Sequence, residues 1–99
     1  MNFDQYDVVR LRHGNVVVIL QHDTFSSFKT RVVAPLVARP AKMLTTTLNP
    51  VVRYARKDWV LGTHLISVIP SSAIAARLGS VAQQEYTIKC AVGQLFLGV

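Results

Sequence analysis

A chain of 99 residues and 11.0 kDa allows one domain, which we place at residues 1–99. Its 51% of hydrophobic and 16% of charged residues exclude an intrinsically disordered chain, and its one cysteine excludes an internal disulfide and a cysteine-based zinc site. The net charge of +6 suits nucleic acid or an acidic protein as partner, although the basic residues are scattered except at 53–57. No apolar run reaches the roughly 18 residues of a membrane span and no signal peptide is recognised, so we expect a cytoplasmic protein.

Short strands are predicted in the first third of the chain. Residues 5–12 alternate imperfectly between apolar and polar, and they end at a turn, residues 13–15, in which Gly14 supplies a positive φ. Residues 16–20 are five apolar β-formers in a row. Such a run is typical of a strand that is buried on both faces, because five residues are too few for a buried helix.

The middle of the chain is less regular in its pattern. Residues 24–30 are polar with two phenylalanines, which predicts a loop whose aromatic side chains anchor it. Residues 32–37 form another apolar run, in which Pro35 predicts an edge strand or a bulge. Residues 45–48 favour a strand, and Asn49-Pro50 is a turn signal.

A hairpin and one further strand complete the predicted β structure. Residues 51–54 and 59–62 are expected to pair across a turn at residues 55–58, and residues 65–69 predict a short strand that ends before Pro70. The fold predicted from this pattern is mostly β, an antiparallel barrel or sandwich of the α+β class, closed by one helix at the C-terminal end.

That helix is predicted from Gln83 onward. Its apolar residues fall at helical spacing: Ile88, Ala91, Val92, Leu95 and Phe96. Gly98 is expected to end it, because glycine enters the left-handed cap freely. Phe96, Leu97 and Val99 are apolar residues at the end of the chain. Two interpretations stay open for them: they fold back onto the barrel, or they contact a partner.

Signatures of catalysis and of metal binding are absent from the sequence. There is no glycine-rich phosphate loop, no His-Glu-x-x-His and no pair of carboxylates at helical spacing, and we expect no cofactor and no metal. His13, His22 and His64 are expected to be solvated loop residues. Cys90 lies in the middle of the predicted helix, without a helix N-terminus to lower its pKa. We therefore do not expect an enzyme.

A metal-free ribonuclease is the catalytic alternative. Such an enzyme needs a base, an acid and a cation for the phosphate, and His22, Asp23, Arg31 and Arg53 have the required chemistry. The alternative requires that Arg31 or Arg53 lie beside His22 in one open groove. It fails if these side chains are dispersed or buried.

The sequence resembles the CcdB toxins of plasmid and chromosomal toxin–antitoxin modules along its whole length. The resemblance rests on the order and spacing of these segments: Met1-Asn2-Phe3 with Tyr6, Gln21-His22-Asp23, Arg31-Val32-Val33-Ala34-Pro35-Leu36, Asn49-Pro50-Val51-Val52, Asp58-Trp59, Ser67-Val68, Ile88-Lys89, and Leu95-Phe96-Leu97-Gly98-Val99. It implies an SH3-like β barrel with a C-terminal helix and a homodimer. It also implies an acidic, CcdA-like antitoxin, which binds operator DNA together with the toxin and represses transcription of the module.

The resemblance further implies a toxic act, the trapping of the DNA gyrase A subunit on cleaved DNA. The family makes this contact with the end of the helix, which here is Phe96, Leu97, Gly98 and Val99. The family's tail has tryptophan where this chain has Leu97, and a polar amide where it has Gly93. A non-toxic homologue that only binds the antitoxin, and an endoribonuclease like MazF or Kid, are therefore the alternatives to a gyrase poison.

Overall fold

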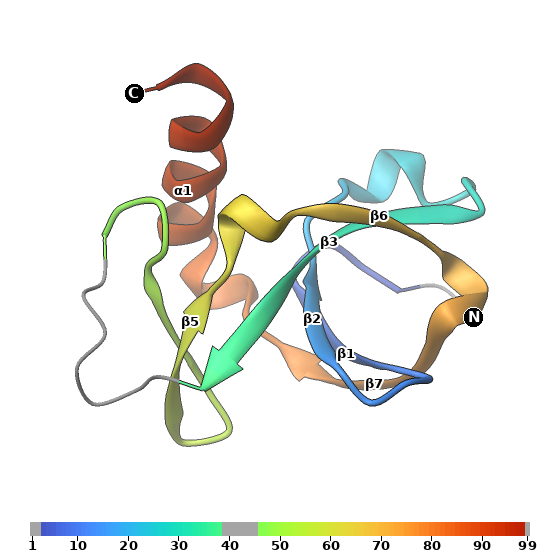
Figure 1. Cartoon of the computed structure of the whole chain (residues 1–99). Helices are drawn as coiled ribbons and strands as arrows, with labels where there is room; N and C mark the ends of the chain where they lie inside the picture. Colours follow the sequence, from blue (N-terminus) through green and yellow to red (C-terminus); the bar gives the residue numbers. More distant parts are fainter. Residues whose placement is uncertain (1–2, 39–45, 99) are drawn as a thin grey trace.

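The computed structural model of the protein describes residues 3–38 and 46–98, which form a curved antiparallel sheet with one helix beside it (Figure 1). The strands are β1 (Asp7–Leu11), β2 (Val16–Ile19), β3 (Thr30–Ala38), β4 (Val51–Tyr54), β5 (Lys57–Leu61), β6 (Ser67–Pro70) and β7 (Ile74–Ser80). Helix α1 is Glu85–Leu97, and the short 3-10 turns are η1 (Asp23–Phe25), η2 (Thr63–Leu65), η3 (Ser71–Ala73) and η4 (Ala82–Gln84). The predicted mostly-β fold with a terminal helix is thus confirmed. Among the described residues, no helix has the length and apolar character needed to cross a membrane.

Strand β3 is the centre of the sheet. The strands follow the order β4-β5-β3-β2-β1-β7, and β6 also pairs with β3. The first half of β3 pairs with β6 and its last residues pair with β5, while β2 lies along its other side. One long strand therefore belongs to both parts of the curved sheet.

Pro35 lies within this central strand, so the prediction of an edge strand or a bulge is wrong. Pairing with β6 ends at Val33 and pairing with β5 begins at Leu36, so no partner strand needs an N–H group from the proline between them. The Pro35 carbonyl accepts a hydrogen bond from the Gly62 N–H at 2.8 Å. A proline is tolerated here because the strand changes partners at this residue.

The hydrophobic core covers both faces of the sheet. Neighbouring residues of one strand enter different clusters: Val8 belongs to one and Val9 to the other, and both are fully buried. Val17 and Val18 divide in the same way, which confirms the prediction that this run is buried on both faces. Helix α1 adds Ile88 to the first cluster.

The two outer strands of the sheet, β4 and β7, meet through side chains. The ring of Tyr54 on β4 lies over Gly79 of β7, so close that a Cβ atom at Gly79 would be 2.8 Å from the ring. The side-chain amide of Gln84 accepts from the Arg53 N–H at 2.8 Å and donates to the Arg53 carbonyl at 2.7 Å. The barrel is closed along this seam by a tyrosine ring and an amide.

Three further predictions differ from the structure. The hairpin of β4 and β5 is confirmed, but its turn is only Ala55-Arg56, both with positive φ (53° and 65°). Residues 46–48, predicted as strand, are irregular, and residue 45 lies outside the described residues. Strand β7 was not predicted. The strand expected at residues 65–69 is β6, which begins two residues later, after the turn η2.

Candidate functional site

Helix α1 is held on the barrel by one face. Ile88 and Ala91 are buried, and Val92 packs against the core cluster. At the start of the helix, Glu85 forms an ion pair with Lys89 at 3.0 Å. Burial and the Glu85 carboxylate raise the pKa of Tyr6. The helix is thus fixed in its first two turns, which defines where its last turn points.

The last turn of the helix presents apolar side chains to solvent. Phe96 is 66% exposed and Leu97 is 74% exposed. Gly98 ends the helix in the left-handed conformation, with φ 75°, and its N–H donates to the Gln94 carbonyl at 2.9 Å. The expected cap is confirmed, and Phe96 and Leu97 do not fold back onto the barrel. Of the four predicted tail residues, Val99 lies outside the described residues.

One stripe along the outer side of helix α1 carries no charged residue. Tyr86, Cys90, Gly93 and Leu97 are spaced at three or four residues, so they follow one stripe along α1. Tyr86 is 81% exposed, and Cys90 is half-buried. A helix of a monomeric protein normally turns polar residues to water, so this stripe is typical of a surface that a partner covers.

A second exposed apolar surface lies on the loop between β2 and β3. Phe25 and Phe28 are predicted to anchor this loop, but they are 47% and 57% exposed. Their rings lie against one another, with 5.6 Å between the ring centroids. Val68 of β6 is exposed beside them, and these side chains line a shallow cavity of about 330 Å³. The sequence signal for this surface is a pair of aromatic residues in a polar loop.

Arg31 shapes this loop from the inside. Its buried guanidinium donates to the carbonyls of Ser26 at 2.8 Å, Phe28 at 2.5 Å and Thr30 at 2.9 Å. A buried cation bonded to three carbonyls fixes the backbone on which the two phenylalanines stand. Arg31 is therefore a positioning residue of this surface.

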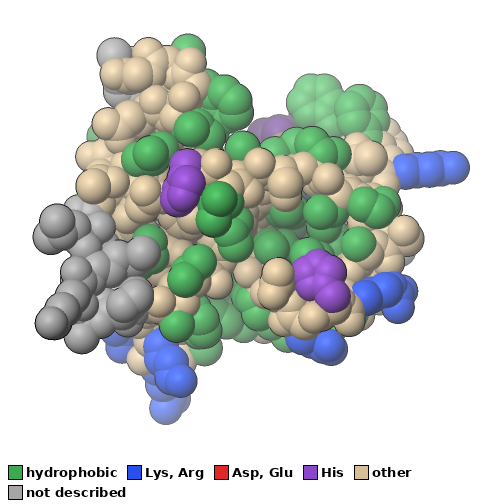
Figure 2. All heavy atoms as spheres, in the orientation of Figure 1, with side chains coloured by type: hydrophobic (Ala, Val, Ile, Leu, Met, Phe, Trp, Pro, Cys, Tyr) green, Lys and Arg blue, Asp and Glu red, His purple; other side chains and the backbone are tan. Residues whose placement is uncertain are grey.

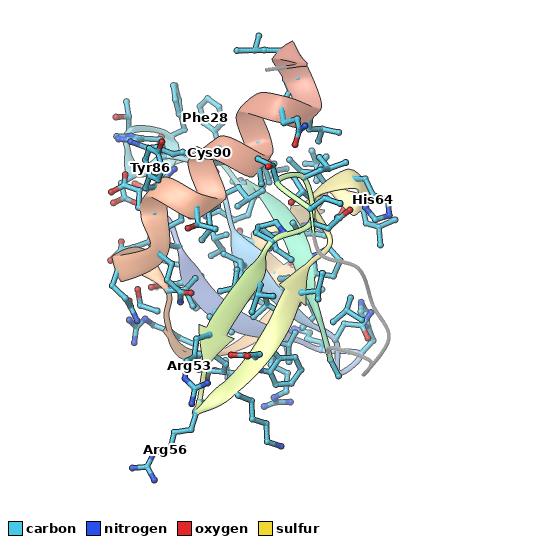
Figure 3. The ribbon with its side chains drawn as sticks, turned by 90° about the vertical axis from the view of Figure 1, so that its left-hand side faces the viewer. Phe28, Arg53, Arg56, His64, Tyr86 and Cys90 are labelled. Carbon is cyan, nitrogen blue, oxygen red and sulfur yellow. The ribbon has the colours of Figure 1, made fainter. Side chains whose placement is uncertain are left out.

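The helix end and the aromatic loop lie at the same end of the molecule. In Figure 1 both are in the upper half, with the helix on the left and the loop on the right, and Figure 3 places Phe28 in the upper half as well. Figure 2 shows hydrophobic side chains on both sides of the hollow between them. This end of the molecule has the character of a protein-binding surface.

The residues considered for a ribonuclease are not brought together. Arg31 is buried, and Arg53 forms an ion pair with Asp58 at 3.1 Å at the opposite end of the molecule from the aromatic loop (Figure 3). The His22 Nδ1 accepts from the Thr24 N–H at 3.0 Å, and Asp23 accepts from the Gln5 N–H at 2.7 Å. These four side chains serve local structure, so the groove that the alternative required is not formed by them.

The other candidate chemical groups lie apart. His13 is in the turn between β1 and β2, and the ring of His64 is hydrogen-bonded to the Asn49 amide at 3.0 Å. Within residues 3–38 and 46–98, no three His, Cys, Asp or Glu side chains form a cluster that could hold a metal ion. The exposed apolar end of the molecule is therefore the candidate site.

Solved structures that are similar in fold include toxins and endoribonucleases. The chain is similar to an endoribonuclease from a mycobacterial species, with TM-score 0.83 and 12% identity over 97% of this chain and 92% of that one. It is also similar to an endoribonuclease in complex with its cognate antitoxin from a mycobacterial species, with TM-score 0.81 and 14% identity over 96% of both chains. The chain is also similar to the Mycobacterium tuberculosis toxin MazF-mt6, with TM-score 0.70 and 19% identity over 91% of this chain and 93% of that one. No curated protein sequence matches the chain significantly.

A small barrel with one C-terminal helix thus places the chain in a fold used by toxins of toxin–antitoxin modules. The family profile described as CcdB protein matches residues 2–98, and the chain belongs to the CcdB family of toxins. This bears out the resemblance that the sequence suggested.

Proposed function

We propose that this toxin poisons DNA gyrase by binding the A subunit through the end of α1. The single observation that carries the proposal is the pair of exposed apolar side chains, Phe96 and Leu97, on a helix whose other end is fixed in the barrel. The proposed site comprises Phe96, Leu97, Gly98 and Val99. The toxin acts in the cytoplasm by holding its target, and it needs no catalytic residue and no cofactor.

The strength of this contact depends on Leu97. A side chain of this size contributes about 1.5–3 kcal/mol when it passes from water into a partner. The tryptophan of the family tail has a larger apolar area and an indole N–H donor, and losing such an anchor costs on the order of 2 kcal/mol, or roughly 30-fold in affinity. We therefore expect binding that is weaker than a tryptophan would provide.

The partners proposed with this function account for the remaining exposed apolar surface. A chain of 99 residues has a modest core, and the stripe of Tyr86, Cys90 and Gly93 is the kind of face that a second copy of the chain or another protein covers. We propose a homodimer. We also propose that an acidic antitoxin binds the toxin, whose net charge is +6, and that the two together repress their own operon on operator DNA.

The test is a gyrase cleavage assay with the purified protein and its Leu97→Trp variant. We expect covalently trapped, cleaved DNA with both, and about 30-fold less protein needed with the variant. A Leu78→Trp variant is the matched control, because Leu78 is also exposed but lies on β7. It is expected to behave as the unsubstituted protein. The absence of trapping by all three proteins contradicts gyrase poisoning, and trapping by Leu97→Trp alone indicates the non-toxic alternative.

Endoribonuclease activity is the second candidate, favoured by the likeness to the mycobacterial endoribonuclease with TM-score 0.83. The dispersed positions of His22, Arg31 and Arg53 speak against a site built from them. The same preparations are therefore incubated with RNA. We expect no RNA cleavage by the unsubstituted protein. If cleavage occurs and survives in Arg53→Ala and His22→Ala variants, the activity belongs to other residues.

A further inference from the structure

The tip of the β4–β5 hairpin carries the only local cluster of basic residues in the sequence. Arg53, Arg56 and Lys57 fall within five residues, and all three are exposed. Asp58 forms an ion pair with Arg53. In the described part of the chain, no carboxylate pairs with Arg56 or Lys57, so the tip has a net positive charge.

The turn at this tip has an unfavourable backbone conformation. Ala55 and Arg56 have φ values of 53° and 65°, in the left-handed region that suits glycine and asparagine. A two-residue hairpin turn of this shape usually contains Asn-Gly. Functional surfaces are known to retain a strained backbone of this kind. Here the strained turn places the Arg56 guanidinium at the outermost point of the hairpin.

The hairpin is held firmly despite its exposed position. The Gln84 amide binds both backbone groups of Arg53, at 2.8 and 2.7 Å, and the Trp59 Nε1–H donates to the Tyr54 carbonyl at 3.0 Å. The Arg53 guanidinium donates to the Arg56 carbonyl at 3.3 Å, across the turn. The basic tip is therefore a preorganised surface.

This surface lies far from the proposed target-binding site. Figure 3 shows Arg53 and Arg56 at the lower end of the molecule, with Arg56 pointing away from the body, while the end of α1 is at the top. Figure 1 gives the same separation from another side. A molecule whose helix end is occupied by a protein can keep the hairpin tip accessible.

We propose that the hairpin tip binds the phosphate backbone of duplex DNA. Guanidinium and ammonium groups are the ordinary phosphate ligands, and a two-stranded ribbon is narrow enough to enter the major groove. A protein partner is less suited, because none of the exposed large hydrophobic side chains of the described residues belongs to β4 or β5, and protein interfaces need apolar anchors.

The contact is sequence-independent and depends on salt. Each phosphate contact contributes about 0.9 to the slope of log affinity against log salt concentration, so a tip of two or three cations gives a slope between about −2 and −3. Such a contact is weak alone. It adds affinity to any complex in which another component already holds the DNA.

The experiment measures binding of a fluorescent DNA duplex to the purified toxin by anisotropy, from roughly 20 to 150 mM salt. Arg56→Glu is compared with Lys29→Glu. Both replacements change the net charge by the same amount at an exposed residue, but Lys29 lies on the loop next to Phe28, at the other end of the molecule. Arg56→Glu is expected to lower affinity about tenfold at the lowest salt and to reduce the slope by about 1, and Lys29→Glu to change affinity less than about twofold.

A second variant separates binding from folding. Ala55→Asn combined with Arg56→Gly gives the turn its preferred residues, so the melting temperature is expected to rise while DNA affinity falls. Equal losses in Arg56→Glu and Lys29→Glu would overturn the proposal, since they would indicate net charge alone. The proposal would also be overturned if the unsubstituted protein does not bind the duplex. The same holds if polyglutamate or duplex RNA competes more strongly than unlabelled DNA. Gyrase is absent from this assay. A negative result therefore overturns the proposed DNA contact and leaves the proposed gyrase poisoning untouched.

Discussion

Arg31 illustrates how far a single residue can be interpreted from sequence. In the sequence it is a cation near His22 and Asp23, which suggested a phosphate ligand. In the structure its guanidinium is buried against the carbonyls of Ser26, Phe28 and Thr30. The sequence does not distinguish an arginine that faces a groove from one that binds its own chain, because the difference depends on the path of the neighbouring loop.

We expect Arg31→Lys to destabilise the protein by about 1.5–3 kcal/mol, because one ammonium cannot reach three carbonyls in the geometry of a guanidinium. The loop of Phe25 and Phe28 is expected to become the first site of proteolysis. Urea unfolding and limited proteolysis measure the two effects. Arg10→Lys, at an exposed residue of β1, serves as control, and equal stability of the two variants would show that the buried guanidinium does not organise the loop.

At the scale of elements, prediction succeeded where one local signal was sufficient. The spacing of Ile88, Ala91 and Leu95 and the glycine at residue 98 predicted α1 and its end. Strand β7 has no regular alternation of apolar and polar residues, and its pairing with β1 contains two register shifts. Its existence depends on a partner strand more than sixty residues away, which a local pattern does not reveal.

The exposed surfaces were predicted only in part. The tail stands out in the sequence because apolar residues at the end of a helix are conspicuous, and the structure decides between the two open interpretations only in leaving Phe96 and Leu97 exposed. Phe25 and Phe28 are predicted to anchor a loop, and the structure leaves both of them exposed. Their exposure follows from the backbone path that Arg31 imposes, and that path is a tertiary property.

Packing between β4 and β7 leads to a prediction for Gly79. Gly79→Ala places a methyl group 2.8 Å from the Tyr54 ring, so the ring or the strand must move, and we expect a loss of about 1–3 kcal/mol in the free energy of unfolding. Denaturant unfolding of Gly79→Ala, Tyr54→Leu and the double variant gives the coupling between the residues. Additive losses would mean that the ring does not rest on Gly79.

At the scale of the whole molecule, two chemically different ends stand out. Phe28, Phe96 and Leu97 are exposed at one end, and Arg53 and Arg56 occupy the other (Figure 3). Between these ends, strands β1, β2 and β3 send neighbouring residues into the core clusters on both faces of the sheet. The proposed gyrase contact and the proposed DNA contact therefore lie at opposite ends of the molecule.

The stability of the whole protein is expected to fall in alkaline solution. Burial and Glu85 raise the pKa of Tyr6 above 10.0, so the folded protein holds the phenol proton more tightly than the unfolded chain. This contribution is present below pH 10.0 and is lost as the pH rises through the pKa of the folded state. The pKa of Lys89 is raised by the same carboxylate and acts in the same direction.

Chemical denaturation between neutral pH and pH 11 tests this dependence, with the range set by the reference tyrosine pKa of about 10. Tyr6→Phe is expected to lose less stability than the unsubstituted protein above pH 10.0, because it has no phenol proton to release. Parallel curves for the two proteins would show that Tyr6 does not titrate differently in the folded state.

The seam closed by Tyr54 and Gln84 also determines how the barrel can open. Strands β4 and β7 are each hydrogen-bonded to one neighbour in the sheet. Across the seam, the Tyr54 ring on β4 contacts Gly79 of β7, and the Gln84 amide of η4 binds the backbone of β4. Turning these two side chains away separates the strands without breaking a backbone ladder. Amide hydrogens on this edge of β4 are therefore expected to exchange with solvent through a local opening that leaves the backbone ladders intact.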